Sequence, residues 1–236
     1  NGSVLTYNAS NGNITLAAAS SGLSNNSSNY QSLGVGTNAL DSETNGSQNT
    51  AFGVEAGTAI SSGNSNTLIG AVCGDAITTG YQNTGVGRDA LAAATTGLFN
   101  TCVGVKAGFG ITSGWYNVAV GRNAGTKHTT GDNNTSVGAN AAEHQSSISN
   151  TAIGFQALRG TSGSSTAQYS TAVGVNAAAA ITTGNWSVAV GAEALQKNTG
   201  GSNTAVGYQA LEENTSGNFN SALGNVALDA NTTASN

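Results

Sequence analysis

The chain has 236 residues, of which only 7% are charged, and its formal net charge is −5. Its six Lys and Arg residues cannot form a basic face for a phosphate backbone, so we expect no nucleic-acid partner. No stretch approaches the ~20 apolar residues of a membrane span, so we expect no membrane insertion. The sequence starts without Met and without a signal-like segment, which suggests a processed chain or an internal fragment.

Residues 1–28 are predicted to be a leading segment, and residues 29–236 to form one repeat domain. Within the leading segment, residues 13–17 read Asn-Ile-Thr-Leu-Ala, which resembles a degenerate copy of the repeat that follows.

From residue 32 onward, a glycine recurs at nearly constant spacing. The twelve copies carry it at Gly36, Gly53, Gly70, Gly87, Gly104, Gly121, Gly138, Gly154, Gly174, Gly191, Gly207 and Gly224. The step between successive glycines is 17 in eight of eleven cases, 16 in two, and 20 from Gly154 to Gly174. A fixed period of this kind is typical of a solenoid. We therefore predict an all-β protein, a β-solenoid or β-roll of about twelve 17-residue turns, with a small loop around residues 160–168.

Each copy opens with a predicted short strand that ends at this glycine. Its second position is usually Thr and its fourth is Val, Ile, Phe or Leu, as at Thr84 and Val86. Alternation by two places both side chains on one face of a strand. We therefore predict that the apolar column from Val35 to Leu223 forms the core and that the Thr column also points inward. The glycine predicts a corner that needs positive φ or close chain approach.

A second short strand is predicted three residues after the glycine, where eleven of twelve copies have Ala and the exception is Cys73. A column limited to small side chains indicates two closely packed layers. The next position is Leu in six copies and Gly or Ala in the others, where Ile often follows three residues later, as at Gly57 and Ile60. One core pocket per turn, filled from either site, explains the exchange. His128 and Gln145 break this rule, so their turns are predicted to be the least well packed.

Asn opens nine of the twelve strands. Stacked at ~4.8 Å, these side chains are predicted to form an amide ladder that satisfies the polar groups of a buried corner.

The inventory for catalysis is poor, because there are only two histidines and the acidic residues are scattered singly. No nucleophile, base and orienting group recur together and no metal-ligand spacing appears, so we expect no enzyme, no cofactor, and no catalytic or metal-binding residues. His128 is interpreted as a turn residue that fills the vacant Ile position. Cys73 and Cys102 lie in different columns two turns apart, and both are predicted to be unpaired.

Aromatic residues give a candidate contact surface. Of thirteen, eight fall in the two positions before the opening Asn or Ser of a strand, which places them near one edge of the solenoid. They pack against neighbouring turns or other subunits, or they form a ridge that contacts a receptor or glycan. The candidate contact residues are Tyr81, Trp115, Tyr116, Tyr169 and Trp186.

The strand motif resembles two known groups of proteins. Residues 117–121 (Asn-Val-Ala-Val-Gly) and 187–191 (Ser-Val-Ala-Val-Gly) closely resemble the head repeat of trimeric autotransporter adhesins. Residues 203–211, followed by the turn at 214–217, look like repeats of tail-fibre and related structural proteins of marine bacteriophages. The resemblance implies a left-handed β-roll and a parallel homotrimer in which three rolls pack side by side. This chain departs from the adhesin pattern in its longer period and its Thr at the second strand position.

Three hypotheses about function follow. The first is a structural and adhesive component of a phage tail fibre or other virion appendage, which extends to the host and contacts a surface glycan or receptor. The alternative is a bacterial surface adhesin or a self-assembling extracellular filament protein. The third, an ice-binding solenoid, is suggested by the Thr column. It is weakest because that column shares a face with the predicted core, and a flat ice-binding array would place Thr at two alternating outward positions.

Overall fold

The computed structural model describes residues 5–8, 13–16, 23–24, 32–161 and 165–235, and every regular element in these ranges is a β-strand. The strands are β1 (Leu5–Asn8), β2 (Asn13–Leu16), β3 (Leu23–Ser24), β4 (Leu33–Val35), β5 (Thr50–Phe52), β6 (Thr67–Ile69), β7 (Thr84–Val86), β8 (Thr101–Val103), β9 (Val118–Val120), β10 (Thr135–Val137), β11 (Thr151–Ile153), β12 (Thr171–Val173), β13 (Val188–Val190), β14 (Thr204–Val206) and β15 (Ser221–Leu223).

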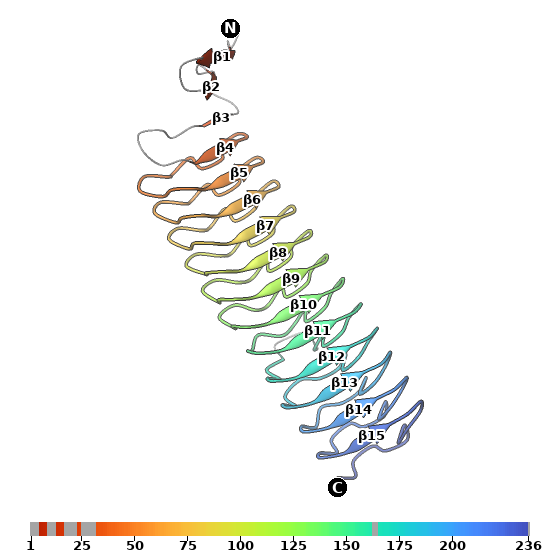
Figure 1. The fold of residues 1–236 in the computed structure, drawn as a ribbon. Helices are drawn as coiled ribbons and strands as arrows, with labels where there is room; N and C mark the ends of the chain where they lie inside the picture. Colours follow the sequence, from red (N-terminus) through yellow and green to blue (C-terminus); the bar gives the residue numbers. More distant parts are fainter. Residues whose placement is uncertain (1–4, 9–12, 17–22, 25–31, 162–164, 236) are drawn as a thin grey trace.

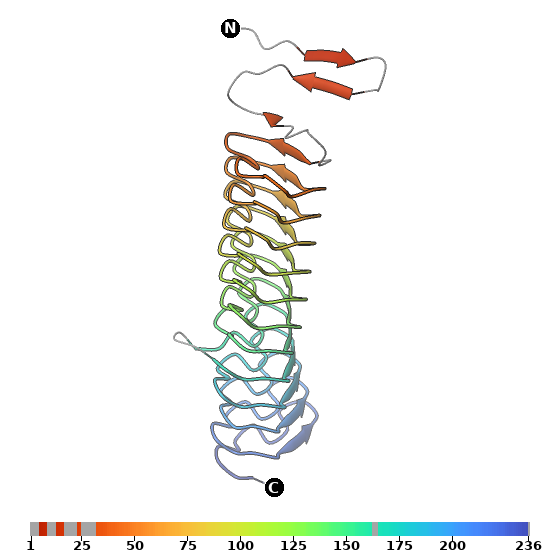
Figure 2. The same cartoon turned by 90° about the vertical axis from the view of Figure 1, so that its left-hand side faces the viewer.

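The predicted solenoid is confirmed. Strands β4 to β15 stack in chain order into one parallel sheet along a rod (Figure 1). Equivalent residues of successive repeats lie side by side, as Val103 does beside Val120. Seen from the side, the strands line one face of the rod and the turn segments line the other (Figure 2). We call one turn of this solenoid a coil and name it by its strand.

The first three strands pair differently from the coils. The candidate degenerate copy forms β2, which pairs antiparallel with β1 in a separate two-stranded sheet, with Asn8 beside Asn13. Strand β3 pairs antiparallel with β4 at the first edge of the long sheet. The boundary predicted after residue 28 lies outside the described residues.

The strand side chains face the opposite way from the prediction. In β4 to β15 the middle residue is buried and the two flanking residues are more exposed; in β9, Ala119 is 0% exposed. The apolar column from Val35 to Leu223 and the Thr column beside it therefore both point away from the core. The reason is the narrowness of the coil: a Cβ added at Gly85 would lie 2.7 Å from the Sγ of Cys73. Only the small middle column fits inside. We call the outward side chains of β4–β15 the strand face.

The second segment of each coil is not a strand, which corrects the prediction of two strands per coil. Two of its residues have left-handed backbone, as at Asp89 and Leu91 with φ of 58° and 55°. This conformation interrupts the extended geometry that a strand needs. Neighbouring coils are nevertheless joined by backbone hydrogen bonds there, as from Leu91 N–H to the Ala107 carbonyl at 3.1 Å.

The core pocket is filled from either of two sites, as predicted. Leu91 is fully buried in its coil, and Ile60 is fully buried in a coil that has Gly57 at the Leu position. A Cβ added at Gly57 would lie 3.0 Å from the Cδ1 of Ile60. The two residues therefore compete for one volume, and the sequence keeps that volume occupied by exchanging them.

The core is interrupted where His128 and Gln145 occupy this pocket. Both side chains are fully buried, so they fill the space, as interpreted for His128. The two ring nitrogens of His128 and the Oε1 of Gln145 have no hydrogen-bond partner among the described residues. One apolar cluster ends at Ala124 and the next begins at Ala141. The space in these two coils is therefore occupied. Their weakness is that these core side chains carry polar atoms without hydrogen-bond partners among the described residues.

This buried imidazole predicts acid sensitivity. Burial lowers the pKa of His128 from 6.5 to about 4. Between these two pH values the unfolded chain therefore binds a proton at His128 and the folded chain does not. The contribution of His128 to stability is therefore constant above pH 6.5 and falls as the pH drops from 6.5 to 4, by about 3 kcal/mol in total. The variant His128→Ile, which copies Ile111 of the preceding coil, should not show this fall in stability between pH 6.5 and 4. Denaturant unfolding of both proteins between pH 4 and 7.5 measures the difference; parallel pH profiles would contradict the assignment.

The amide ladder is confirmed at the opening corner. Asn100 donates from its Nδ2 to the Oδ1 of Asn83 at 3.1 Å and to the Gly114 carbonyl at 2.8 Å. Its own Oδ1 accepts from the backbone N–H and the Nδ2 of Asn117. The same pattern runs through buried Asn residues from β6 to β10 and changes at Ser170 and Ser187, whose hydroxyls make longer contacts of 3.3 to 3.4 Å.

The glycine after each strand is required by its surroundings. At Gly104 the φ is +135°, and an added Cβ would lie 2.6 Å from the carbonyl oxygen of Gly121. Gly224 has a similar φ of +127° but nothing within 4 Å of that position. The predicted corner is thus confirmed on both grounds, positive φ and close approach of the next coil.

These two glycines form a matched pair for a prediction. Gly104→Ala should lower the free energy of unfolding by about 2 kcal/mol more than Gly224→Ala, because both substitutions strain the backbone and only the first meets an immovable carbonyl. Urea unfolding followed by circular dichroism measures the difference. Equal losses would show that the close approach has no energetic weight.

The longest step between corner glycines is accommodated after Gly160. The Gly160 N–H still donates to the Ala179 carbonyl, and the Thr166 N–H donates to the Thr182 carbonyl. Ser165 pairs with Gln145 of the preceding coil. The predicted loop is therefore confined to the few residues after Gly160, of which 162–164 lie outside the described residues.

Candidate functional site

The aromatic residues gather at the corner that precedes the Asn ladder. Here each coil from β5 to β15 has one residue with left-handed backbone, with φ of 57° at Phe99, 55° at Tyr116 and 56° at Trp186. The corner turns these side chains out of the rod, since Tyr116 is 53% exposed and Trp186 is 62% exposed. We call this row of corner side chains the aromatic edge.

The first part of the aromatic edge spans three coils. The rings of Phe99 and Tyr116 stack with centroids 4.7 Å apart and planes within 3°. Tyr81 meets Phe99 edge to face at 5.3 Å. Trp115 lies beside Tyr116 in the same coil, where its backbone N–H donates to Asp132. Three of the five candidate contact residues are therefore brought together.

Phe99 was not among the candidate contact residues, yet its ring connects Tyr81 to Tyr116. The signal was present in the sequence, because Phe99 stands one repeat before Tyr116 in the same column.

The second part of the aromatic edge contains the other two candidates. Tyr169 and Trp186 have nearly parallel rings, 5° apart, with centroids at 6.3 Å. The next coil has Ser202 in this column, so no aromatic ring follows Trp186 there. Asn133 and Ser149 occupy the column between the two parts. The candidates therefore form two separate patches on one edge.

These rings pack against neighbouring coils and keep much of their surface in solvent. Trp115 and Trp186 remain 50% and 62% exposed. Flat, exposed aromatic rings on a rigid support are suited to receptor contacts and to stacking on a sugar ring.

The strand face is a second exposed surface. Its larger apolar side chains are Leu33, Phe52, Ile69, Ile153 and Leu223, which are 40% to 82% exposed. At five of the twelve positions that follow a corner glycine, a large side chain adds to this surface: Val54, Val105, Phe155, Val175 and Tyr208, at 40% to 50%. An apolar strip that runs along a whole sheet differs from the single apolar residues scattered over ordinary surfaces.

The outward Thr column changes the argument about ice binding. Thr50 and Thr101 are exposed, so the earlier objection, that the Thr column shares a face with the core, was wrong. The companion column at the other outward position is apolar, as at Phe52 and Val103. The array of two Thr columns that a flat ice-binding surface would present is therefore not formed.

Titratable groups form no cluster with metal-binding geometry among the residues that the structure describes. Cys73 and Cys102 are free and buried, which confirms that they are unpaired. Burial raises the pKa of Cys73 to about 12, and it raises the pKa of Cys102 as well. No helix capable of crossing a membrane occurs in the described ranges.

In comparisons with protein-family models, curated proteins and solved structures, nothing matched this chain.

Proposed function

We propose that the chain is a structural and adhesive component of a fibre, in a phage tail or another virion appendage, that extends to the host surface. It acts without catalysis, and three parallel copies form the fibre. The observation that carries the proposal is the exposed strand face of a rod with regular coils, on which an apolar column lies beside the Thr column. The resemblance to tail-fibre repeats, at residues 203–211, supplies the biological setting.

The strand face supplies part of the area that a subunit interface needs. Twelve strands at ~4.8 Å spacing and three residues each give a surface of about 550 Å². Five exposed side chains in the column after the corner glycines, including Val54 and Val175, widen this strip in their own coils, whereas Arg88 and Arg122 occupy the column in two others. A stable interface needs about 800 Å² on each partner. Three copies that pack through this face and its bordering corner would remove it from water.

The aromatic edge is the proposed contact surface for a host glycan or receptor. It occupies a different corner of the coil from the glycine that ends the strand, so copies associated through the strand face can keep it in solvent. Trp186, with its 62% exposed side chain, is the strongest single candidate.

An alternative location is the bacterial surface, where the chain would act as an adhesin or a self-assembling extracellular filament. Filament growth by parallel stacking of ends is disfavoured by one observation. Strand β3 lies antiparallel on β4, at the edge where the last coil of a second copy would continue the parallel sheet.

The location can be tested by mass spectrometry of gradient-purified particles and of washed cell envelopes from the same culture. The proposal expects peptides of this chain in the particles, in proportion to known virion proteins. Peptides found only in the envelope or secreted fraction would replace the virion assignment by the adhesin alternative.

A further inference from the structure

A cleft of about 270 Å³ lies on the turn side of the rod, across the coils of β11, β12 and β13. Ala179 and Ala180 of the middle coil have the shortest side chains of its lining, so we take them as its floor. The coil before contributes Arg159, and the coil after contributes Gln196 and Lys197. The cleft therefore has two walls of long side chains, which are two coils apart, or about 10 Å. Between them lie the methyl groups of the two alanines.

The backbone fixes the three coils in register. The Gly160 N–H donates to the Ala179 carbonyl at 3.1 Å, and the Ala180 N–H donates to the Gln196 carbonyl at 2.9 Å. The walls are thus held at a set distance by the sheet-like bonds beneath them. The backbone of the cleft is therefore in place before a ligand arrives.

Arg159 is the unusual member of the cleft. Its Nε is buried and has no hydrogen-bond partner, and the guanidinium forms no ion pair with any residue that the structure describes. A buried, unsatisfied guanidinium nitrogen is costly unless something pairs with it. The group therefore lacks an acceptor, and a carboxylate matches its fork of donors.

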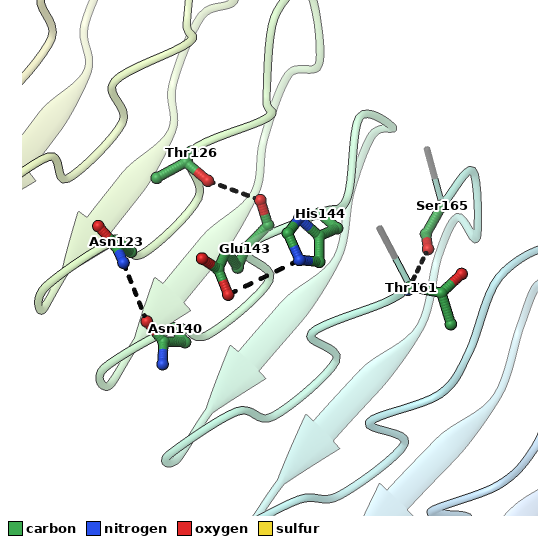
Figure 3. A network of polar contacts seen from close by, with 7 residues as sticks. All are labelled: Asn123, Thr126, Asn140, Glu143, His144, Thr161 and Ser165. Atoms are coloured by element: carbon green, nitrogen blue, oxygen red, sulfur yellow. Dashed lines mark hydrogen bonds and ion pairs between the residues drawn. The ribbon is translucent and has the colours of Figure 1, made fainter. Parts of the chain in front are cut away.

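The nearby acids form no ion pair with Arg159 among the described residues. Glu143 occupies the column of Arg159 one coil earlier, and its Oε2 lies 3.8 Å from the Nε2 of His144 (Figure 3). On the other side, Lys197 pairs with Glu213, and Glu193 accepts from Gln209. Among the described residues, Arg159 is thus the cation of the cleft that has no ion-pair partner.

The other lining groups suit a sugar. Gln156, Asn176 and Gln196 each present an amide, which can donate to and accept from hydroxyl groups. The alanine floor can lie under the apolar face of a ring. The volume is just below the ~300 to 1,000 Å³ of sites for drug-sized ligands, which suits a single sugar unit.

We propose that this cleft binds one carboxylate-bearing sugar unit, a uronic acid, of an acidic surface glycan. The guanidinium of Arg159 pairs with the carboxylate and the three amides bind the hydroxyls. This inference rests on the proposed function, because it names a ligand for the host-contacting fibre, and it places that ligand away from the aromatic edge.

Saturation-transfer NMR on the whole chain tests it with three probes: methyl glucuronide, methyl glucoside and acetate. Only the glucuronide should bind appreciably. Arg159→Ala should weaken its binding about tenfold or more, the loss expected for a charge-assisted hydrogen-bonded pair. Ala180→Gln, whose longer side chain would occupy the space above the floor, should abolish binding.

Two matched controls keep the test specific. Arg122→Ala removes an arginine outside the cleft, and Ala93→Gln makes the same change in the equivalent position of the β7 coil. Both should bind glucuronide as the parent chain does.

Equal binding of glucoside, competition by acetate as strong as by glucuronide, or unchanged binding by Arg159→Ala would each overturn the proposal. None of these outcomes affects where the chain is located or how many copies associate, so a failure here is distinguishable from failure of the fibre assignment.

Discussion

The substitution Ala119→Asp is expected to unfold the centre of the rod, whereas Val120→Asp, one residue later, is expected to leave each chain folded and to prevent copies from associating. Ala119 is fully buried in the middle of β9, and its neighbours in the sheet are the small residues Cys102 and Ser136. A carboxylate there has no partner, so Ala119→Asp should cost about 4 kcal/mol or more. Val120 lies on the strand face, where the new carboxylate reaches water in an isolated chain and costs less than about 1 kcal/mol.

Urea unfolding by circular dichroism and the mass of each variant in solution separate the two effects. The expected pattern is a large loss of stability for Ala119→Asp and a folded species of lower mass for Val120→Asp. The reverse pattern, with Val120→Asp unfolding an isolated chain, would restore the inward orientation first predicted from the sequence.

The substitution Asn100→Ala is expected to have the second largest effect, about 4 kcal/mol. The variant loses four side-chain hydrogen bonds inside the rod and leaves the carbonyl of Gly114 and the backbone N–H of Asn117 without partners. Each buried polar group left unsatisfied costs about 1 to 3 kcal/mol. Because coils contact only their neighbours, the damage should be centred on three coils.

Asn100→Ser is the matched control, because Ser170 and Ser187 occupy this column naturally. Their hydroxyls retain contacts with the adjacent coils at 3.3 to 3.4 Å. The serine variant should therefore lose about half as much stability as the alanine variant. Hydrogen exchange of the amides near Asn117 locates the effect; uniform exchange along the whole rod would contradict a local ladder.

The period and the packing rules could be predicted from the sequence, because they depend on which residue types recur. The corner glycines, the Asn ladder and the exchange of Leu91-type and Ile60-type side chains each follow from a column with one physical demand. The structure confirms all three.

The orientation of the strand could not be predicted from hydrophobicity, because the coil is too thin for its most apolar column. In an ordinary sheet, Val118 and Val120 would face the core and Ala119 would not. Here the second chain segment lies so close that the middle column must be small, and its one large member, Leu68, lies against Gly57 and Gly74. The pairing of a large Leu68 with Gly57 and Gly74 was therefore the signal in the sequence that the middle column points inward.

Of the two candidate sites, one could be predicted from the sequence and the other could not. The aromatic edge could be predicted from column position, because the rings recur at the corner residue of successive repeats. The cleft could not, because it depends on two alanines in one coil lying between long side chains of the coils on either side, beside the longest step between corner glycines.

Sedimentation equilibrium of the purified chain is the most direct test of the account, since the strand face is proposed to be covered by two further copies. The predicted result is a species of three times the 23.1 kDa chain mass that dissociates to folded single chains in Val120→Asp. A single well-folded species of 23.1 kDa, for the parent chain at all concentrations measured, would contradict it.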